Sequence, residues 1–163
     1  MRVLIATASR RGATSAIGGT ISQVLADRGF DVVQTAVGSR VELASYDAAV
    51  VGSGVYNRHW LPAAEEFVYA NATTLHAKPV WLFSNGPTRT TSYLEGRPLG
   101  WRSLAAAAGA RGHQVFGTVD RPTLAVADDR AGGVAREFAD WEAVRVWARS
   151  IAAELGRPAS RSA

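Results

Sequence analysis

A short polar loop near the N-terminus contains residue types that can bind an anion. This first loop, residues 9–14, reads Ser-Arg-Arg-Gly-Ala-Thr and separates an apolar, strand-like run from apolar residues at helical spacing. A helix that begins there directs unpaired backbone N–H groups and the positive end of its dipole toward one point. The amides of residues 11–14 would form a concave anion site. Ser9 and Thr14 add hydroxyl groups, and Gly12 permits the tight turn.

Two arginines, Arg10 and Arg11, lie in the middle of the first loop, and their role is open. A guanidinium can form charge-assisted hydrogen bonds to a phosphate dianion, which would strengthen an anion site. The same side chains could equally point into water. Ala13 would contribute its backbone N–H alone. We therefore count all three among the candidate binding residues.

The elements that must position this loop alternate between strands and helices. Short apolar runs predict five strands, at residues 3–6, 31–37, 48–53, 79–84 and 114–119. Helical spacing and capping signals predict a helix after the first loop and further helices at residues 62–71, 103–108 and 140–155. Gly29 and Gly109 are expected to end the helices that precede them, and Asp140 is expected to cap the start of the last one.

This alternation predicts an α/β fold, specifically a three-layer αβα sandwich around a five-stranded parallel sheet in the order 2-1-3-4-5. Ligands of such sheets bind beyond the carboxyl ends of the strands, at the switch point between strands one and three. Three loops leave that edge: the first loop, a second loop at residues 54–61 and a third loop at residues 85–99. We expect one domain, residues 1–156, followed by a disordered tail, residues 157–163.

Composition excludes several function classes. The chain has 163 residues, 18 Lys and Arg against 14 Asp and Glu, a net charge of +4 and no cysteine, so disulfides, thiolate metal sites and thiol nucleophiles are excluded. The three histidines show no metal-ligand spacing. No basic run interleaved with aromatic residues, no apolar run of about 20 residues and no signal peptide is present, so we expect a cytoplasmic protein without nucleic-acid binding or a membrane span.

Four segments, in chain order, resemble one known family. The first loop resembles the phosphate loop of flavodoxins: a hydroxyl residue, two variable positions, glycine, one variable position and threonine. Typical flavodoxins have neutral residues where this chain has its two arginines. Residues 50–62, 81–87 and 138–144 are similar to the second and third flavin loops and the start of the last helix in flavodoxin-domain proteins related to menaquinone-dependent protoporphyrinogen oxidase. The resemblance covers residues 2–155 and implies a flavodoxin-like fold that binds flavin mononucleotide (FMN).

The resemblance also implies where each part of the cofactor lies. The phosphate would sit in the first loop, and the isoalloxazine ring would lie between the second and third loops. The candidate cofactor-binding residues are then Ser9, Arg10, Arg11, Gly12, Ala13, Thr14, Gly54, Val55, Tyr56, Asn57, Trp60, Ser84, Asn85 and Gly86. Tyr93 and Arg97, further along the third loop, would cover the flavin or line a substrate opening.

Side chains in the second and third loops each have a simpler alternative role. Tyr56 and Trp60 could stack on the flavin, or Trp60 could fix its loop to the following helix. Asn57 and Asn85 could bind the polar edge of the flavin, or could be ordinary loop formers. His59 could donate a proton to a substrate, or could face solvent.

Two classes of function remain. The resemblance implies an FMN-dependent oxidoreductase of the quinone-reductase or protoporphyrinogen-oxidase type, which passes electrons or hydride to a redox partner protein or to a small anionic or quinone-type acceptor. The alternative is a binding or regulatory module of the same fold that has lost FMN, an option that Arg10 and Arg11 keep open. The sequence identifies no catalytic residue, and it leaves a homodimer open.

Overall fold

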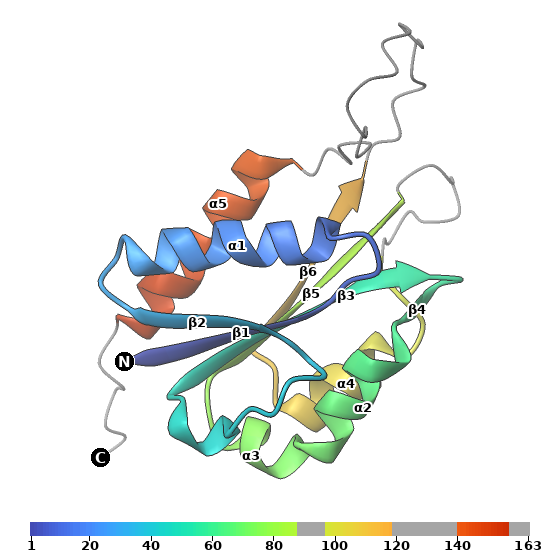
Figure 1. Ribbon diagram of the computed structural model, residues 1–163, viewed down its shortest axis with the longest axis horizontal. Helices are drawn as coiled ribbons and strands as arrows, with labels where there is room; N and C mark the ends of the chain where they lie inside the picture. The colour runs from blue at the N-terminus through green and yellow to red at the C-terminus, as the bar shows by residue number, and fades with distance from the viewer. Residues whose placement is uncertain (88–96, 119–139, 157–163) are drawn as a thin grey trace, which may run out of the picture.

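The protein is built on a central parallel sheet with helices on both faces (Figure 1). The computed structural model describes residues 1–87, 97–118 and 140–156. The strands that form the sheet in the order β2-β1-β3-β5-β6 are β1 (Arg2–Ala8), β2 (Asp31–Ala36), β3 (Ala48–Tyr56), β5 (Val80–Pro87) and β6 (Gly112–Thr118). All neighbours in this order are parallel. With the short β4 left out of the numbering, this is the predicted order 2-1-3-4-5, and the predicted fold class is confirmed.

The helices divide between the two faces of the sheet. One face is covered by α1 (Ala13–Ala26) and α5 (Trp141–Leu155). The other is covered by α2 (Pro62–Ala70), α3 (Ala72–His76) and α4 (Trp101–Ala108), with a 3-10 turn, η1 (Leu43–Ser45), at its border. In the described ranges, no helix combines the length and apolar character needed to cross a membrane.

Alternation along β1 explains why the protein has two hydrophobic cores. Val3 and Ile5 pack under α1 and α5, whereas Leu4 and Ala6 point to the opposite face and pack under α2, α3 and α4. All four side chains are completely buried. A strand covered on both faces is therefore apolar without interruption, which is why the sequence shows a continuous apolar run here and not an alternating one.

The second loop contains more regular structure than the sequence predicts. Strand β3 continues to Tyr56 and turns back through Asn57 and Arg58 into β4 (His59–Trp60), which pairs antiparallel with β3. Both turn residues adopt left-handed backbone conformations, with φ of 48° and 67°. Positive φ at both positions of a two-residue turn is the geometry of a type I′ hairpin. The expected loop at residues 54–61 is thus a strand end and a hairpin.

Several predicted helix boundaries are confirmed. Gly29 and Gly109 end their helices with positive φ values of 86° and 60°. The carboxylate of Asp140 accepts a hydrogen bond from the backbone N–H of Ala143 (3.1 Å), which caps α5. The predicted helix at residues 62–71 ends at Ala70 instead, and α3 follows it. The expected tail, residues 157–163, lies outside the described residues.

A glycine in the central strand lets an aromatic ring lie directly on the sheet. A Cβ atom added to Gly52 would overlap the ring of Phe83, which lies on the neighbouring strand β5. The Phe83 ring is completely buried and makes aromatic contacts with Phe116 and Trp147, at centroid distances of 6.1 Å each. The ring therefore has no room to move away from a new methyl group.

We expect Gly52→Ala to lower the free energy of unfolding by about 3 kcal/mol, because overpacking forces the Phe83 ring off its position. Gly38→Ala is the matched control, since an added Cβ there meets nothing within 4 Å; its effect should stay within about 0.5 kcal/mol. Urea denaturation of the two variants measures the difference. Equal unfolding midpoints would contradict this account of the core.

Candidate functional site

The three predicted loops leave the sheet at one level. In the parallel register, Ala8 of β1 is the partner of Ser53 in β3, and Ser53 is in turn the partner of Ser84 in β5. The chain continues from these positions into the first loop, the β3–β4 hairpin and the third loop. This edge lies at the point where successive strands are added on opposite sides of β1, which is where ligands bind in open α/β sheets. We call this edge the rim.

The first loop has the backbone geometry of an anion site. Gly12 adopts a φ of 87°, and its N–H donates to the hydroxyl of Ser9 (2.9 Å). A Cβ at Gly12 would meet nothing within 4 Å, so the turn is open on its outer side. Helix α1 begins at Ala13 without a side-chain cap and without an acidic residue in its first turn. Its first N–H groups therefore remain available to an anion.

A hollow lies beside the first loop. Its volume is about 470 Å³, and it is lined by Thr7, Ser9, Gly12 and Ser15 together with residues 34–36 at the end of β2. The hollow places open space next to the start of α1, on the side away from the hairpin.

The first loop contacts the β3–β4 hairpin directly. Thr14 is 2% exposed, and a Cβ added to Gly54 would lie 3.4 Å from the Thr14 hydroxyl oxygen and 3.0 Å from Cε2 of Tyr56. The guanidinium carbon of Arg10 lies 4.4 Å from the centre of the Tyr56 ring, in a cation–π contact. Arg10 thus contacts an aromatic ring, an environment that the sequence analysis does not anticipate. Arg11 is exposed.

The start of the third loop lies against the same hairpin. Asn85 is the register partner of Gly54, and a Cβ on Gly86 would lie 3.0 Å from Cβ of Val55. Asn85 is 5% exposed, and its side-chain Oδ1 is buried without a hydrogen-bond partner in the described part of the chain. An unpaired buried amide oxygen costs free energy, so this atom marks a place where a ligand donor could bind.

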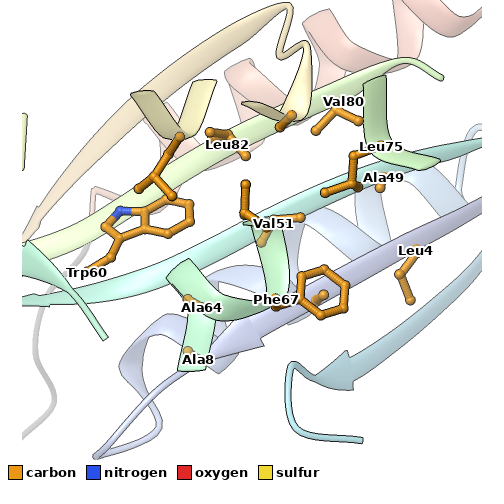
Figure 2. Packing of buried hydrophobic residues seen from close by; sticks show 14 of the residues in the cluster. Leu4, Ala8, Ala49, Val51, Trp60, Ala64, Phe67, Leu75, Val80 and Leu82 are labelled. Carbon is orange, nitrogen blue, oxygen red and sulfur yellow. The ribbon is translucent and has the colours of Figure 1, made fainter. Parts of the chain in front are cut away.

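The indole ring of Trp60 lies within the core (Figure 2). Trp60 is 2% exposed and belongs to the same hydrophobic cluster as Val51 and Leu82. Its Nε1–H donates to the hydroxyl of Ser84 (2.7 Å). These contacts favour a structural role for Trp60 over stacking on a flavin, because neither face of the ring is open to a ligand. The predicted alternative fixed the loop to the following helix, whereas the hydrogen bond fixes the hairpin to Ser84 of β5.

A half-buried histidine continues this hydrogen-bonded chain. Nε2 of His113, on β6, lies 2.7 Å from the hydroxyl of Ser84. The ring of Trp101 stacks on the imidazole at a centroid distance of 5.3 Å and an interplanar angle of 16°. Sequence reasoning assigns His113 no role, because nothing in the sequence indicates that residues 29 positions apart meet across two strands. Only the strand register could have identified the pair.

The surroundings of His113 favour its neutral form. Burial, and secondarily the charge of Arg97, lower the pKa of His113 from 6.5 to about 4. Its other nitrogen, Nδ1, is buried without a partner among the described residues. An imidazolium would place an N–H group there with nothing to accept it, which agrees with the direction of the pKa shift.

The remaining candidate residues lie further out on the rim. Asn57 and His59 are exposed on the hairpin. The guanidinium of Arg97 lies 4.3 Å from the centre of the Trp101 ring, and the N–H of Leu99 donates to the carbonyl of Arg58 (2.6 Å). Tyr93 lies outside the described residues. Within the described ranges, no group of three or more His, Asp or Glu side chains could hold a metal ion.

The sheet order and the rim define a doubly wound α/β protein of the flavodoxin type. A family model described as "Flavodoxin domain" matches residues 4–122, and the chain therefore belongs to the flavodoxin domain family. Membership in this family implies a flavin cofactor and a redox role.

Individual relatives agree with this assignment. The chain is 28% identical, over an alignment 178 positions long including gaps, to protoporphyrinogen IX dehydrogenase [quinone] of Escherichia coli K12, with 97% of this chain and 98% of the relative covered. Among solved structures, it resembles a cysteine-to-serine mutant of the flavodoxin from Pseudomonas aeruginosa (TM-score 0.67, 18% identity, 95% and 99% coverage). It also resembles a flavodoxin from the Archaea (TM-score 0.66, 16% identity, 96% and 100% coverage). These two structures support the fold.

The lowered pKa of the half-buried His113 predicts a pH-dependent stability. Between pH 6.5 and about 4, the unfolded chain binds a proton that the folded chain excludes. The free energy of unfolding should therefore fall as the pH falls through this window, by up to roughly 3 kcal/mol from this residue. His113→Leu should flatten this part of the stability curve, whatever its effect at pH 7. Urea denaturation across the window measures the slope, and an unchanged slope in the variant would show that His113 does not cause it.

Proposed function

We propose that this protein binds FMN noncovalently at the rim and acts as a flavin-dependent oxidoreductase. The observation that supports this most directly is the convergence of the first loop, the β3–β4 hairpin and the start of the third loop, with the unpaired amide oxygen of Asn85 among them. The match of residues 4–122 to the flavodoxin domain family supports a flavin as the ligand of this site. The alternative of a module that has lost the flavin is not favoured, because the site retains these features.

The first loop fits the phosphate of FMN. The open turn at Gly12 and the free N–H groups at the start of α1 suit a doubly charged phosphate. Thr14 would add a hydroxyl hydrogen bond, while Ser9 already holds the turn through Gly12 and could donate its own proton outward.

The hairpin and the third loop fit the ring. Gly54 and Gly86 keep the backbones of the two segments free of side chains where they approach each other. Asn85 would accept a hydrogen bond from the polar edge of the ring. Tyr56, which is half-buried, is the aromatic side chain available for ring contact, and we assign Trp60 the role of holding Ser84 and the hairpin in place.

FMN bound there would supply one-electron and two-electron redox chemistry. The chain itself would bind the phosphate and orient the ring. Tyr56, Gly54 and Gly86 would lie against the ring and limit the access of water to it. The named activity of the Escherichia coli relative suggests a quinone-type acceptor, with a partner protein as the other option. A cytoplasmic location and a homodimer stay predictions.

An absorbance spectrum of the purified protein tests the proposal. A yellow preparation with the bands of oxidised flavin, or quenching of added FMN fluorescence at micromolar protein, is the expected result. A folded, colourless protein that leaves FMN fluorescence unchanged would refute it.

Thr14→Val should weaken FMN binding by about 1–3 kcal/mol, roughly 5- to 150-fold, because the hydroxyl is lost while the shape is kept. Thr20→Val, in the same helix but away from the rim, is the matched control and should retain wild-type affinity. Fluorescence titration with FMN measures both. Equal affinities for the two variants would remove Thr14 from the site.

Asn85→Leu should weaken FMN binding without lowering the stability of the flavin-free protein. Without flavin, replacing an amide that has an unpaired buried oxygen by an apolar side chain of similar size should leave the free energy of unfolding unchanged or raise it by about 1 kcal/mol. With flavin, the lost hydrogen bond should weaken FMN affinity about 10-fold. Denaturation and titration of the same preparation measure the two effects. A variant that loses stability but binds FMN normally would place Asn85 in a purely structural role.

A further inference from the structure

Four exposed arginines follow the rim from one end to the other. We call them the cationic arc: Arg10, Arg58, Arg97 and Arg102. They come from the first loop, the turn of the hairpin and the segment that leads into α4, which are far apart in the sequence.

Contacts between these segments make the arc continuous. Arg10 lies over Tyr56, and Arg58 follows Tyr56 by two residues in the hairpin turn. The carbonyl of Arg58 accepts a hydrogen bond from Leu99, and the guanidinium groups of Arg97 and Arg102 lie 4.3 Å and 5.6 Å from the centre of the Trp101 ring.

No carboxylate neutralises this arc in the described part of the chain. Residues 9–14, 54–61 and 97–102 contain no Asp or Glu. The salt bridges that the structure describes involve Arg2, Arg145 and Arg149, none of which belongs to the arc. Among residues 1–87, 97–118 and 140–156, the positive charge of the arc is therefore not paired with a carboxylate.

The arrangement of the charges favours a broad partner over a small anion. Arg10 lies on Tyr56, while Arg97 and Arg102 both lie on Trp101, so these three guanidinium groups gather at two separate aromatic rings and not around one point. Leu99, within the arc, is 44% exposed and adds an apolar contact. Aromatic and arginine side chains with an apolar centre are typical of protein interfaces.

We infer that the cationic arc is the docking surface for a redox protein with an acidic face around its own redox centre. This inference rests on the proposed function, because the arc borders the place where the flavin ring would lie. Complementary charge would steer the partner to the rim and shorten the path for electrons.

The test measures binding of the full-length protein to two haem proteins of opposite charge, acidic cytochrome b5 and basic cytochrome c. At low ionic strength, we expect binding to cytochrome b5 that weakens at least about 10-fold in about 0.5 M salt, and no binding to cytochrome c. Vesicles that contain phosphatidylglycerol provide a third probe. Binding to such vesicles with none to cytochrome b5 would overturn the inference in favour of a membrane surface.

Two double variants with equal charge change separate the arc from net charge. R58Q/R102Q should weaken binding to cytochrome b5 about 10-fold. R28Q/R111Q is the matched control, because both arginines lie at the amino ends of the strands, away from the rim. Arg111 also matches Arg102 in its local contact: each guanidinium lies 5.6 Å from the centre of a tryptophan ring, Trp81 for Arg111 and Trp101 for Arg102. The control should bind as the wild type does. Equal weakening in both variants would show a nonspecific charge effect.

A kinetic measurement separates this inference from the proposed function. After reduction of the FMN-loaded protein by dithionite, each two-electron-reduced flavin would give one electron to each of two Fe(III) haems, which yields two Fe(II) haems, oxidised flavin and released protons. R58Q/R102Q should slow the reduction of cytochrome b5 about 10-fold without changing the reduction of neutral menadione. A protein that binds no FMN refutes the proposed function. A protein that binds FMN and reduces cytochrome b5 equally fast with and without the arc refutes the docking surface alone.

Discussion

The site depends on one structural constraint, the parallel hydrogen-bonded register of β3 with β1 on one side and β5 on the other. This register sets Ala8, Ser53 and Ser84 at the same height across the sheet. A shift of one residue in β5 would turn Ser84 toward α1 and α5 and Phe83 toward α2 and α4, because successive side chains of a strand point to opposite faces. The buried ring of Phe83 against Gly52 opposes such a shift, since only glycine leaves room for it.

Two buried serines at that height, one on β3 and one on β5, hold the hairpin against the sheet by hydrogen bonds. The hydroxyl of Ser53 accepts a hydrogen bond from the backbone N–H of Leu61 (3.0 Å), and the hydroxyl of Ser84 accepts one from the indole of Trp60 (2.7 Å). Both serines are completely buried, so each bond acts where competing water is absent. The hairpin is therefore held from within the core by directed polar contacts, and its outer surface is left for a ligand.

Periodicity predicted the fold because it depends on which side chains must avoid water. It failed at the end of β3, where residues 54–56 were predicted as loop but pair as strand, Gly54 with Asn85 of β5 and residues 55–56 with β4. The turn that follows was missed as well: Arg58 adopts a φ of 67°, a position where hairpin sequences usually show glycine. The sequence left two roles open for Trp60 and gave none to His113, because the contacts of both side chains depend on Ser84, a residue distant in the chain.

Departures from local rules gather at the rim, and this concentration is itself an argument for a binding site. Asn57 and Arg58 hold left-handed conformations that cost about 1 kcal/mol each, and Asn85 and His113 each bury a polar atom without a partner in the described chain. Away from the rim, residues 3–6 of β1 are apolar and completely buried, although the hydroxyl of Ser22 in α1 is also buried without a partner among the described residues. A fold tolerates such costs where the surrounding core is strong enough to impose them. A ligand that satisfied the amide of Asn85 and the open turn at Gly12 would recover part of this free energy on binding and would thereby stabilise the folded protein.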